Sequence, residues 1–249
     1  TVVGPDPDFA LIWSDEFEGP AGRAIDSEFW THDIGGGGWG NEQLEFNTSR
    51  VSNSSLDGDG NLAIVAREES FGGNDFTSAR IETRGKFEVQ YGRIEARIQL
   101  PRGRGIWPAF WMLGGEPEDW PWIGEIDIME NRGRDTNVIL ASVHGPGYSG
   151  GDSITQRFRR EEDDGFDADF HVYRVDWDRG RLAFSIDGEV YHTVTPFTVN
   201  PRGDWVFNRP FYLLLNIAVG GTFVLPPDDS TQFPQTMLVD YVRVYERTR

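Results

Sequence analysis

Residues 93–100 read RIEARIQL, a stretch in which apolar residues alternate with charged or polar ones. Because successive side chains of a β-strand point to opposite faces, this period of two predicts a strand with one buried face and one solvated face. The stretches FHVYRVDW at 170–177 and LVDYVRVYE at 238–246 alternate in the same way. Helical spacing of three and four residues is nowhere sustained for three turns, so the chain is predicted to be almost entirely β-structure.

Antiparallel pairing is indicated by RLAFSIDGEVYHTV at 181–194. Asp187-Gly188 lies at its centre, and this dipeptide favours the type I′ turn that joins two hairpin strands. YLLLNIAV at 212–219 is more continuously apolar, which is typical of a central strand buried on both faces. We therefore expect an all-β jelly-roll sandwich of two large antiparallel sheets, formed by residues 1–249 as a single domain.

Composition narrows the classes of ligand. The 249 residues include 41 acidic and 23 basic side chains, and the resulting net charge of −18 disfavours nucleic acid and anionic membranes as partners. The chain has no cysteine, which excludes disulfides, thiol nucleophiles and cysteine-ligated zinc. No apolar run reaches the ~18 residues that a membrane-spanning helix needs. We expect a monomer that binds neither nucleic acid nor membrane.

The stretch WIGEIDIMEN at 122–131 carries three carboxylates within a strand-like sequence. In a regular strand Glu125 and Asp127 point to one face, and Glu130 points to the other. One extra residue, a β-bulge around Ile128-Met129, would return Glu130 to the face of the first two. The sequence therefore predicts three aligned carboxylates, with the aliphatic residues between them directed to the core.

Such an alignment favours glycosidase chemistry. With the bulge, extended Glu125 and Glu130 side chains can bring their carboxyl groups to roughly 5 Å, the separation found in retaining glycosidases. One glutamate then attacks the anomeric carbon while the other protonates the leaving oxygen. Asp127 lies between them and can separate the pKa values of the cluster. Two other interpretations stay open on periodicity alone: a Ca²⁺ or Mg²⁺ site, and a solvated strand face.

Tryptophans are concentrated just before the carboxylates. Indole faces stack on the apolar faces of pyranose rings, and this density of tryptophan exceeds what a core ordinarily needs. Carbohydrate is therefore the leading ligand class. The four side chains are Trp107, Trp111, Trp120 and Trp122.

With these motifs the chain resembles glycoside hydrolase family 16, whose bulged signature E-I-D-x-x-E is present in GEIDIMEN. The unbulged form E-x-D-x-E is typical of lichenases and xyloglucan-modifying enzymes, and this chain has the extra residue. The bacterial laminarinase branch is matched over nearly the whole chain. The matching blocks are WSDEF (13–17), WGNEQLEF (39–46), SARIETRGKFEVQYGRIEARI (78–98), WPAFWMLG (107–114), SVHG (142–145), LLLNIAVGG (213–221) and LVDYVRVY (238–245).

This resemblance implies a concanavalin-like jelly roll with a substrate cleft on its concave face. It also implies retaining endo-hydrolysis of β-1,3-glucosidic linkages in laminarin-type β-glucans. Glu125 would be the nucleophile, Glu130 the acid/base, and Asp127 the residue that tunes the nucleophile. The substrate-binding residues expected from the resemblance or from the tryptophan cluster are Asn41, Arg80, Trp107, Trp111, Trp120, Trp122, His144 and Asn216.

The resemblance implies no catalytic cofactor but a structural Ca²⁺. Its ligands would come from Glu18, Gly60 and Asp240, and oxygen donors of this kind suit a hard cation. A plain turn without metal is the alternative. The glucanase hypothesis implies a secreted enzyme. TVVGPDPDFA at the N-terminus has neither the basic stretch nor the apolar run of a signal peptide, so we expect either a mature form whose targeting segment has been removed or a sequence without that segment.

Other functions on the same fold are also considered. The polysaccharide could be mixed-linkage 1,3-1,4-β-glucan, agar or carrageenan, and the covalent intermediate could be captured by a sugar hydroxyl in transglycosylation. A non-catalytic β-glucan-binding protein could keep the tryptophans and lose the carboxylates. All three acids are present here, which argues against that last alternative.

Overall fold

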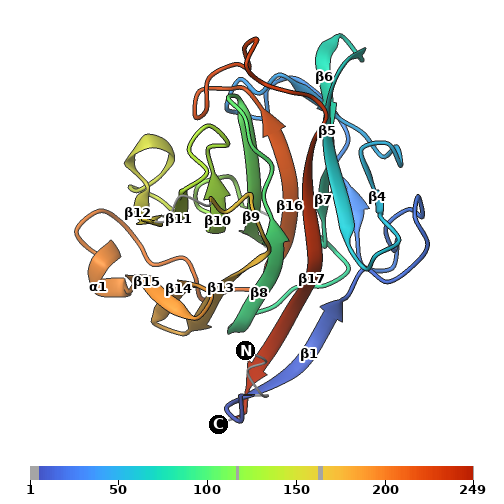
Figure 1. Cartoon of the computed structure of the whole chain (residues 1–249). Coiled ribbons are helices and arrows are strands. Elements are labelled where there is room, and N and C mark those ends of the chain that lie inside the picture. Colours follow the sequence, from blue (N-terminus) through green and yellow to red (C-terminus); the bar gives the residue numbers. More distant parts are fainter. Residues whose placement is uncertain (1–5, 116–117, 162–164, 249) are drawn as a thin grey trace.

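Two β-sheets packed face to face form the computed structural model of the protein, which describes residues 6–115, 118–161 and 165–248 (Figure 1). Within these residues helical structure is confined to the single turns η1 (Gly150–Asp152) and α1 (Pro196–Val199). The all-β prediction is confirmed. No described helix has the length and apolar character needed to cross a bilayer.

The larger sheet has the order β15-β14-β13-β8-β17-β5-β6-β3, with β1 paired to β17 and β4 paired to β5. Its strands are β1 (Phe9–Asp15), β3 (Glu45–Asn47), β4 (Ser54–Leu56), β5 (Leu62–Phe71), β6 (Asn74–Ser78), β8 (Gly92–Gln99), β13 (His171–Asp178), β14 (Arg181–Ile186), β15 (Glu189–Val194) and β17 (Gln235–Arg247). The first and last strands of the chain therefore lie side by side (Figure 1).

The smaller sheet has seven strands in the order β12-β11-β10-β9-β16-β7-β2 and is antiparallel throughout. Its strands are β2 (Thr31–His32), β7 (Arg80–Glu82), β9 (Ile106–Gly114), β10 (Glu125–Asn131), β11 (Val138–His144), β12 (Ile154–Arg159) and β16 (Phe211–Val219). The continuously apolar strand β16 lies between β9 and β7, and each of its nine residues is buried, as the sequence predicts.

The hairpin predicted around Asp187-Gly188 joins β14 to β15. Both turn residues have positive φ, 51° for Asp187 and 87° for Gly188, as a type I′ turn requires. One pairing differs from the antiparallel expectation, because β3 and β6 run parallel. β5 precedes β6 and pairs with it in an antiparallel hairpin. β5 therefore runs opposite to β3, and β6 runs in the same direction as β3.

Apolar residues from the inner faces of both sheets meet between them. Ile94, Ala96 and Ile98 of β8 are fully buried there, and so is Ile126 of β10. The alternation in RIEARIQL therefore correctly identifies the core face of β8.

The opposite face of β8 is not uniformly solvated, contrary to the prediction. Glu95 lies on it and is only 5% exposed. Arg174, directly across on β13, donates to Glu95 through Nε at 2.8 Å and Nη2 at 2.7 Å, and the Tyr245 hydroxyl lies 3.3 Å away. Alternation places Glu95 on the outer face, and these cross-strand partners then bury it.

Replacing Glu95 with alanine is expected to lower the free energy of unfolding by about 3 kcal/mol, because Arg174 is left without its partner in a largely buried position. Asp178→Ala is the control: its pair with Arg247 is 42% and 40% exposed at the side chains. Such an exposed pair contributes about 1 kcal/mol or less. Guanidinium unfolding of both variants measures the difference, and equal losses would contradict the assignment.

Candidate active site

A cleft of about 1010 Å³ crosses the outer face of the seven-stranded sheet. Its floor is built from rows of residues that lie opposite one another on neighbouring strands. One such row runs across six strands through Arg80, Asn216, Ala109, Glu130, Leu140 and Arg157, all of which line the cleft. The cleft therefore runs across the strands, and each strand contributes only a few of its side chains.

Glu125, Asp127 and Glu130 all line this cleft, although regular alternation would turn Glu130 inward. The register of β10 shifts between Asp127 and Glu130, where Asp127 pairs with Ser142 and Glu130 with Leu140 on β11. Two residues on β10 thus span one residue on β11, which is the predicted bulge. Ile128 and Met129, inside the bulge, are buried in the core.

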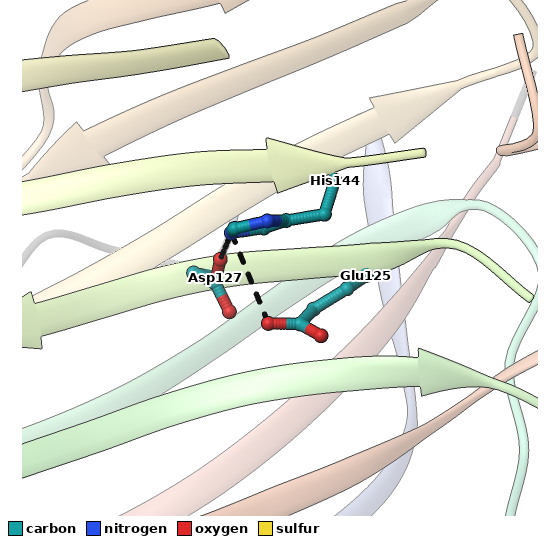
Figure 2. Close-up of side chains that lie close together, drawn as sticks. All are labelled: Glu125, Asp127 and His144. Atoms are coloured by element: carbon teal, nitrogen blue, oxygen red, sulfur yellow. Dashed lines mark ion pairs between the residues drawn. The ribbon is translucent and has the colours of Figure 1, made fainter. Parts of the chain in front are cut away.

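The Glu125 carboxylate is held from two sides. Trp120 donates through Nε1 to Glu125 Oε2 at 2.8 Å, and Nε2 of His144 lies 3.9 Å from the other oxygen. His144 projects from the neighbouring strand β11 toward both Glu125 and Asp127, and its Nε2 lies 3.0 Å from Asp127 Oδ2 (Figure 2).

A backbone contact fixes the tautomer of His144. The N–H of Gly150 donates to His144 Nδ1 at 3.1 Å. A backbone N–H can only donate, so Nδ1 must carry a lone pair and the imidazole proton is on Nε2. Nε2 is the ring nitrogen nearer to Asp127 and Glu125, so Gly150, the first residue of η1, fixes which nitrogen lies beside these carboxyls.

Glu130 is a carboxyl in a far more enclosed position. It is 8% exposed, accepts from Trp107 Nε1 at 3.0 Å, and lies 3.4 Å from the Ser142 hydroxyl. Burial and the negative charge of the neighbouring Asp127 raise the pKa of Glu130 to about 8. At neutral pH Glu130 is therefore predominantly protonated and can donate a proton into the cleft.

A sequence model described as glycosyl hydrolases family 16 matches residues 40–243. The chain belongs to this family. The β-glucanase of Rhodothermus marinus is 41% identical over 96% of this chain and 86% of its own length. A glucan endo-1,3-β-glucosidase of Cryptopygus antarcticus is 34% identical over 94% and 91%. The laminarinase catalytic domain of Thermotoga maritima superposes with a TM-score of 0.91, at 44% identity over 97% of this chain and 100% of that one.

Asp127 completes the family 16 carboxylate cluster. It is 3% exposed, and burial together with the adjacent Glu125 carboxylate raises the pKa of Asp127 well above its usual range. In its protonated form Asp127 can donate a hydrogen bond to Glu125. The cluster therefore combines two buried carboxyls of raised pKa, Asp127 and Glu130, with the more exposed Glu125.

Glu125, Asp127 and His144 also have the spacing of a metal site, since their ligand atoms all lie within 4.8 Å of one another. The groups around the carboxylates are donors, however: the indole N–H groups of Trp120 and Trp107 face Glu125 and Glu130. Donors of this kind stabilise carboxylates without a cation. Family 16 glycosidases need no catalytic cofactor, which agrees with this arrangement.

Arg80 has structural contacts beyond those expected of a sugar-binding residue. Its guanidinium lies between the rings of Trp39 and Trp111, 5.0 and 4.8 Å from their centroids, and its Nε is 3.2 Å from Asp33 Oδ2. Trp111 Nε1 donates to Asn216 Oδ1 at 2.7 Å. Arg80 and Asn216 thus hold Trp111 in the cleft wall, and Asn41 lines the same cleft.

Among the expected substrate-binding residues, Trp122 lies apart. It is 57% exposed and does not line the cleft, although Trp120, two residues earlier, does. The turn at Pro121 separates the two indoles, which sequence proximity does not reveal. The expected calcium residues also lie away from the cleft lining.

Several cleft residues were not identified from the sequence. Trp39 and Ser142 fall inside blocks that resemble the family, so those blocks were the available signal. Arg84 also falls inside such a block. Other residues carry no local motif, because sheet register or loop placement brings them to the cleft; among them are Arg132, Arg157, Tyr212 and Phe223.

Proposed function

We propose that this chain is a retaining endo-β-1,3-glucanase that hydrolyses laminarin-type β-glucans. The observation that carries the proposal is the β10 bulge, which places Glu125 and Glu130 on one cleft floor in contrasting environments. One carboxylate is held at the cleft surface by an indole N–H, and the other is a buried acid. Relatives named β-glucanase, glucan endo-1,3-β-glucosidase and laminarinase supply the substrate class.

In the first step, Glu125 attacks the anomeric carbon of the bound sugar. Glu130 gives its proton to the glycosidic oxygen as the carbon–oxygen bond breaks, and the shortened chain leaves with a free hydroxyl. The N–H of Trp120 binds the Glu125 oxygen that does not attack and so fixes the direction of the other. The product is a glycosyl ester of Glu125.

In the second step, Glu130 is a carboxylate and accepts a proton from water. The water oxygen attacks the anomeric carbon, the ester bond breaks, and Glu125 leaves as a carboxylate while Glu130 is protonated again. Two inversions give net retention. His144 acts on this sequence indirectly, by directing its Nε2–H toward Asp127 and Glu125.

A time course of laminarin digestion followed by NMR tests the proposal, with barley mixed-linkage glucan alongside. Early β-anomer together with oligosaccharides of mixed length supports a retaining endo-enzyme. Early α-anomer would exclude retention, and glucose alone would exclude endo-action. A faster rate on the barley glucan would favour the mixed-linkage alternative instead. Binding of both glucans without cleavage would support a glucan-binding protein.

The pH dependence of kcat/KM is expected to show an alkaline limb near pH 8. Catalysis requires the protonated form of Glu130, so activity falls as the pH rises through its pKa of about 8. Trp107→Phe removes the N–H that stabilises the Glu130 carboxylate and should move this limb to higher pH. A limb that stays in place in this variant would show that another group controls it.

We also propose that a structural Ca²⁺ binds at Glu18, Gly60 and Asp240. The last residue of β1, Asp15, pairs with Val242 of β17, and the first residue of β5, Leu62, pairs with Val239. Asp240 lies between these two positions on β17, where the segment after β1 and the segment before β5 converge. Glu18 and Gly60 are close neighbours: a Cβ added to Gly60 would lie 3.8 Å from Glu18 Oε1. Carboxylate and carbonyl oxygens suit this cation, although Arg97 Nη1 contacts Asp240 Oδ2 at 2.6 Å and would compete for it.

Removing calcium with EDTA is expected to lower the melting temperature by several degrees, because the ion would fasten the N-terminal segment to β17. Asp240→Asn should abolish the response to added Ca²⁺. Asp178→Asn, on the same sheet, should retain it. An unchanged melting curve of the native protein with and without Ca²⁺ would refute the site.

We further propose that the chain acts as one catalytic domain, as a secreted monomer. Polymeric glucan is met outside the cell, and a net charge of −18 opposes self-association. Light scattering should give the monomer mass of 28.1 kDa, and twice that mass would refute the monomer. Laminarinase activity in the culture medium rather than the cell lysate of the producing organism tests secretion.

A further inference from the structure

Two arginines line the cleft beyond Glu130 without an acidic partner. Arg132 follows β10 directly, and Arg157 lies on β12. Across the sheet, Glu130 pairs with Leu140, and Leu140 pairs with Arg157. Two strand spacings put the Arg157 backbone roughly 10 Å from that of Glu130. In the described part of the chain neither arginine forms an ion pair, whereas Arg80 at the other end of the row is paired with Asp33.

The Arg132 guanidinium is held by a stack of aromatic rings. Its Cζ lies 4.2 Å from the ring centroid of Phe223, and Phe223 lies 4.7 Å from the ring of Trp107. Trp107 in turn donates to Glu130. A guanidinium stacked in this way keeps its N–H groups at the ring edge, free to bind a ligand.

Arg132 is close to two acidic groups, Glu130 and Asp135, but forms an ion pair with neither among the described residues. Its Nε is buried and has no hydrogen-bond partner among the described residues. Burial and the positive charges of Arg157 and Arg134 lower the pKa of Arg132. Neighbouring like charges that lack direct ion pairs favour a bound anion, because the anion reduces their mutual repulsion and can accept from the unpartnered Nε.

This positive end of the cleft contrasts with the rest of a chain that carries a net charge of −18. Outside the catalytic cluster, Glu118 is the acidic side chain that lines the cleft among the residues that the structure describes, and it forms an ion pair with Arg209. Arg132 and Arg157 therefore place two positive charges at the Glu130 end of the cleft.

We propose that Arg132 and Arg157 form a subsite for an anionic substituent, a sulfate ester or a carboxylate, on a sugar of the leaving-group side. The side follows from the proposed function, on which the inference rests: Glu130 protonates the leaving oxygen, so the sugars beyond it belong to the departing chain. The enzyme would then accept charged β-glucans as well as neutral laminarin.

Three probes test the subsite: neutral laminarin, lightly sulfated laminarin, and laminarin oxidised at C6 to carry carboxylates. The ratio of kcat/KM on each charged probe to that on neutral laminarin is measured at low ionic strength. Arg157→Gln should lower this ratio at least tenfold for one or both charged probes. Arg181→Gln is the matched control, since it removes the same charge from an exposed position on β14 and should change the ratio less than twofold.

Binding separates this inference from the proposed function. In a Glu125→Gln background, calorimetry compares sulfated and neutral laminarihexaose with and without Arg157→Gln. A selective loss of affinity for the sulfated ligand supports the subsite even if no glucan is cleaved. Equal effects on charged and neutral ligands, or no effect of Arg157→Gln and Arg132→Gln on either ratio, would overturn it and leave these arginines as partners of sugar hydroxyls.

Discussion

Glu125→Gln is expected to lower kcat on laminarin by about 10³-fold or more, because an amide oxygen cannot form the glycosyl ester. The fold should be unaffected. Glu125 lies at the cleft surface, and the amide oxygen of glutamine can still accept from Trp120 Nε1. Glucan binding should also persist, since the aromatic walls of the cleft are unchanged.

The measurement combines reducing-end assays with calorimetry on laminarihexaose. Glu189→Gln serves as the control because Glu189 is an exposed carboxylate at the start of β15, away from the cleft lining. Its activity should equal that of the native chain. If Glu125→Gln kept more than a few per cent of activity in a preparation free of native enzyme, Glu125 would not be the nucleophile.

Glu130→Ala is expected to reduce hydrolysis of laminarin by about 10²- to 10⁴-fold, the usual contribution of a general acid and base. An aryl β-laminaribioside with a good leaving group needs little protonation, so the variant should still form the glycosyl ester from it. The ester then accumulates, because no base activates water.

Azide should rescue this second step. Azide is already an anion, so it attacks the anomeric carbon without a general base. The space left by the Glu130 side chain can admit it to that carbon. The expected product is the β-glycosyl azide, identified by NMR. An α-azide would show that no covalent intermediate forms on Glu125. Rescue of Glu125→Gln under the same conditions would instead assign the two glutamates the opposite roles.

Much of the fold follows from local sequence. The alternation in 93–100, the Asp187-Gly188 turn and the continuous apolar run of β16 each specify structure through short-range geometry. The structure agrees with the turn, with the run and with the core face of β8, whereas Glu95 on the opposite face of β8 is buried. The bulge was also predictable, because only an extra residue lets Glu130 share a face with Glu125 and Asp127.

The sequence alone therefore determined the strand pattern, the bulged carboxylate motif and the family, because these depend on neighbours along the chain. Tertiary structure alone decided which side chains act on those carboxylates. Gly150 orients His144, Arg80 lies between Trp39 and Trp111, and Arg157 shares a row with Glu130. Cross-strand register and loop placement bring these groups together from distant segments. Burial in the tertiary structure then raises the pKa of Glu130, and no local sequence pattern encodes that burial.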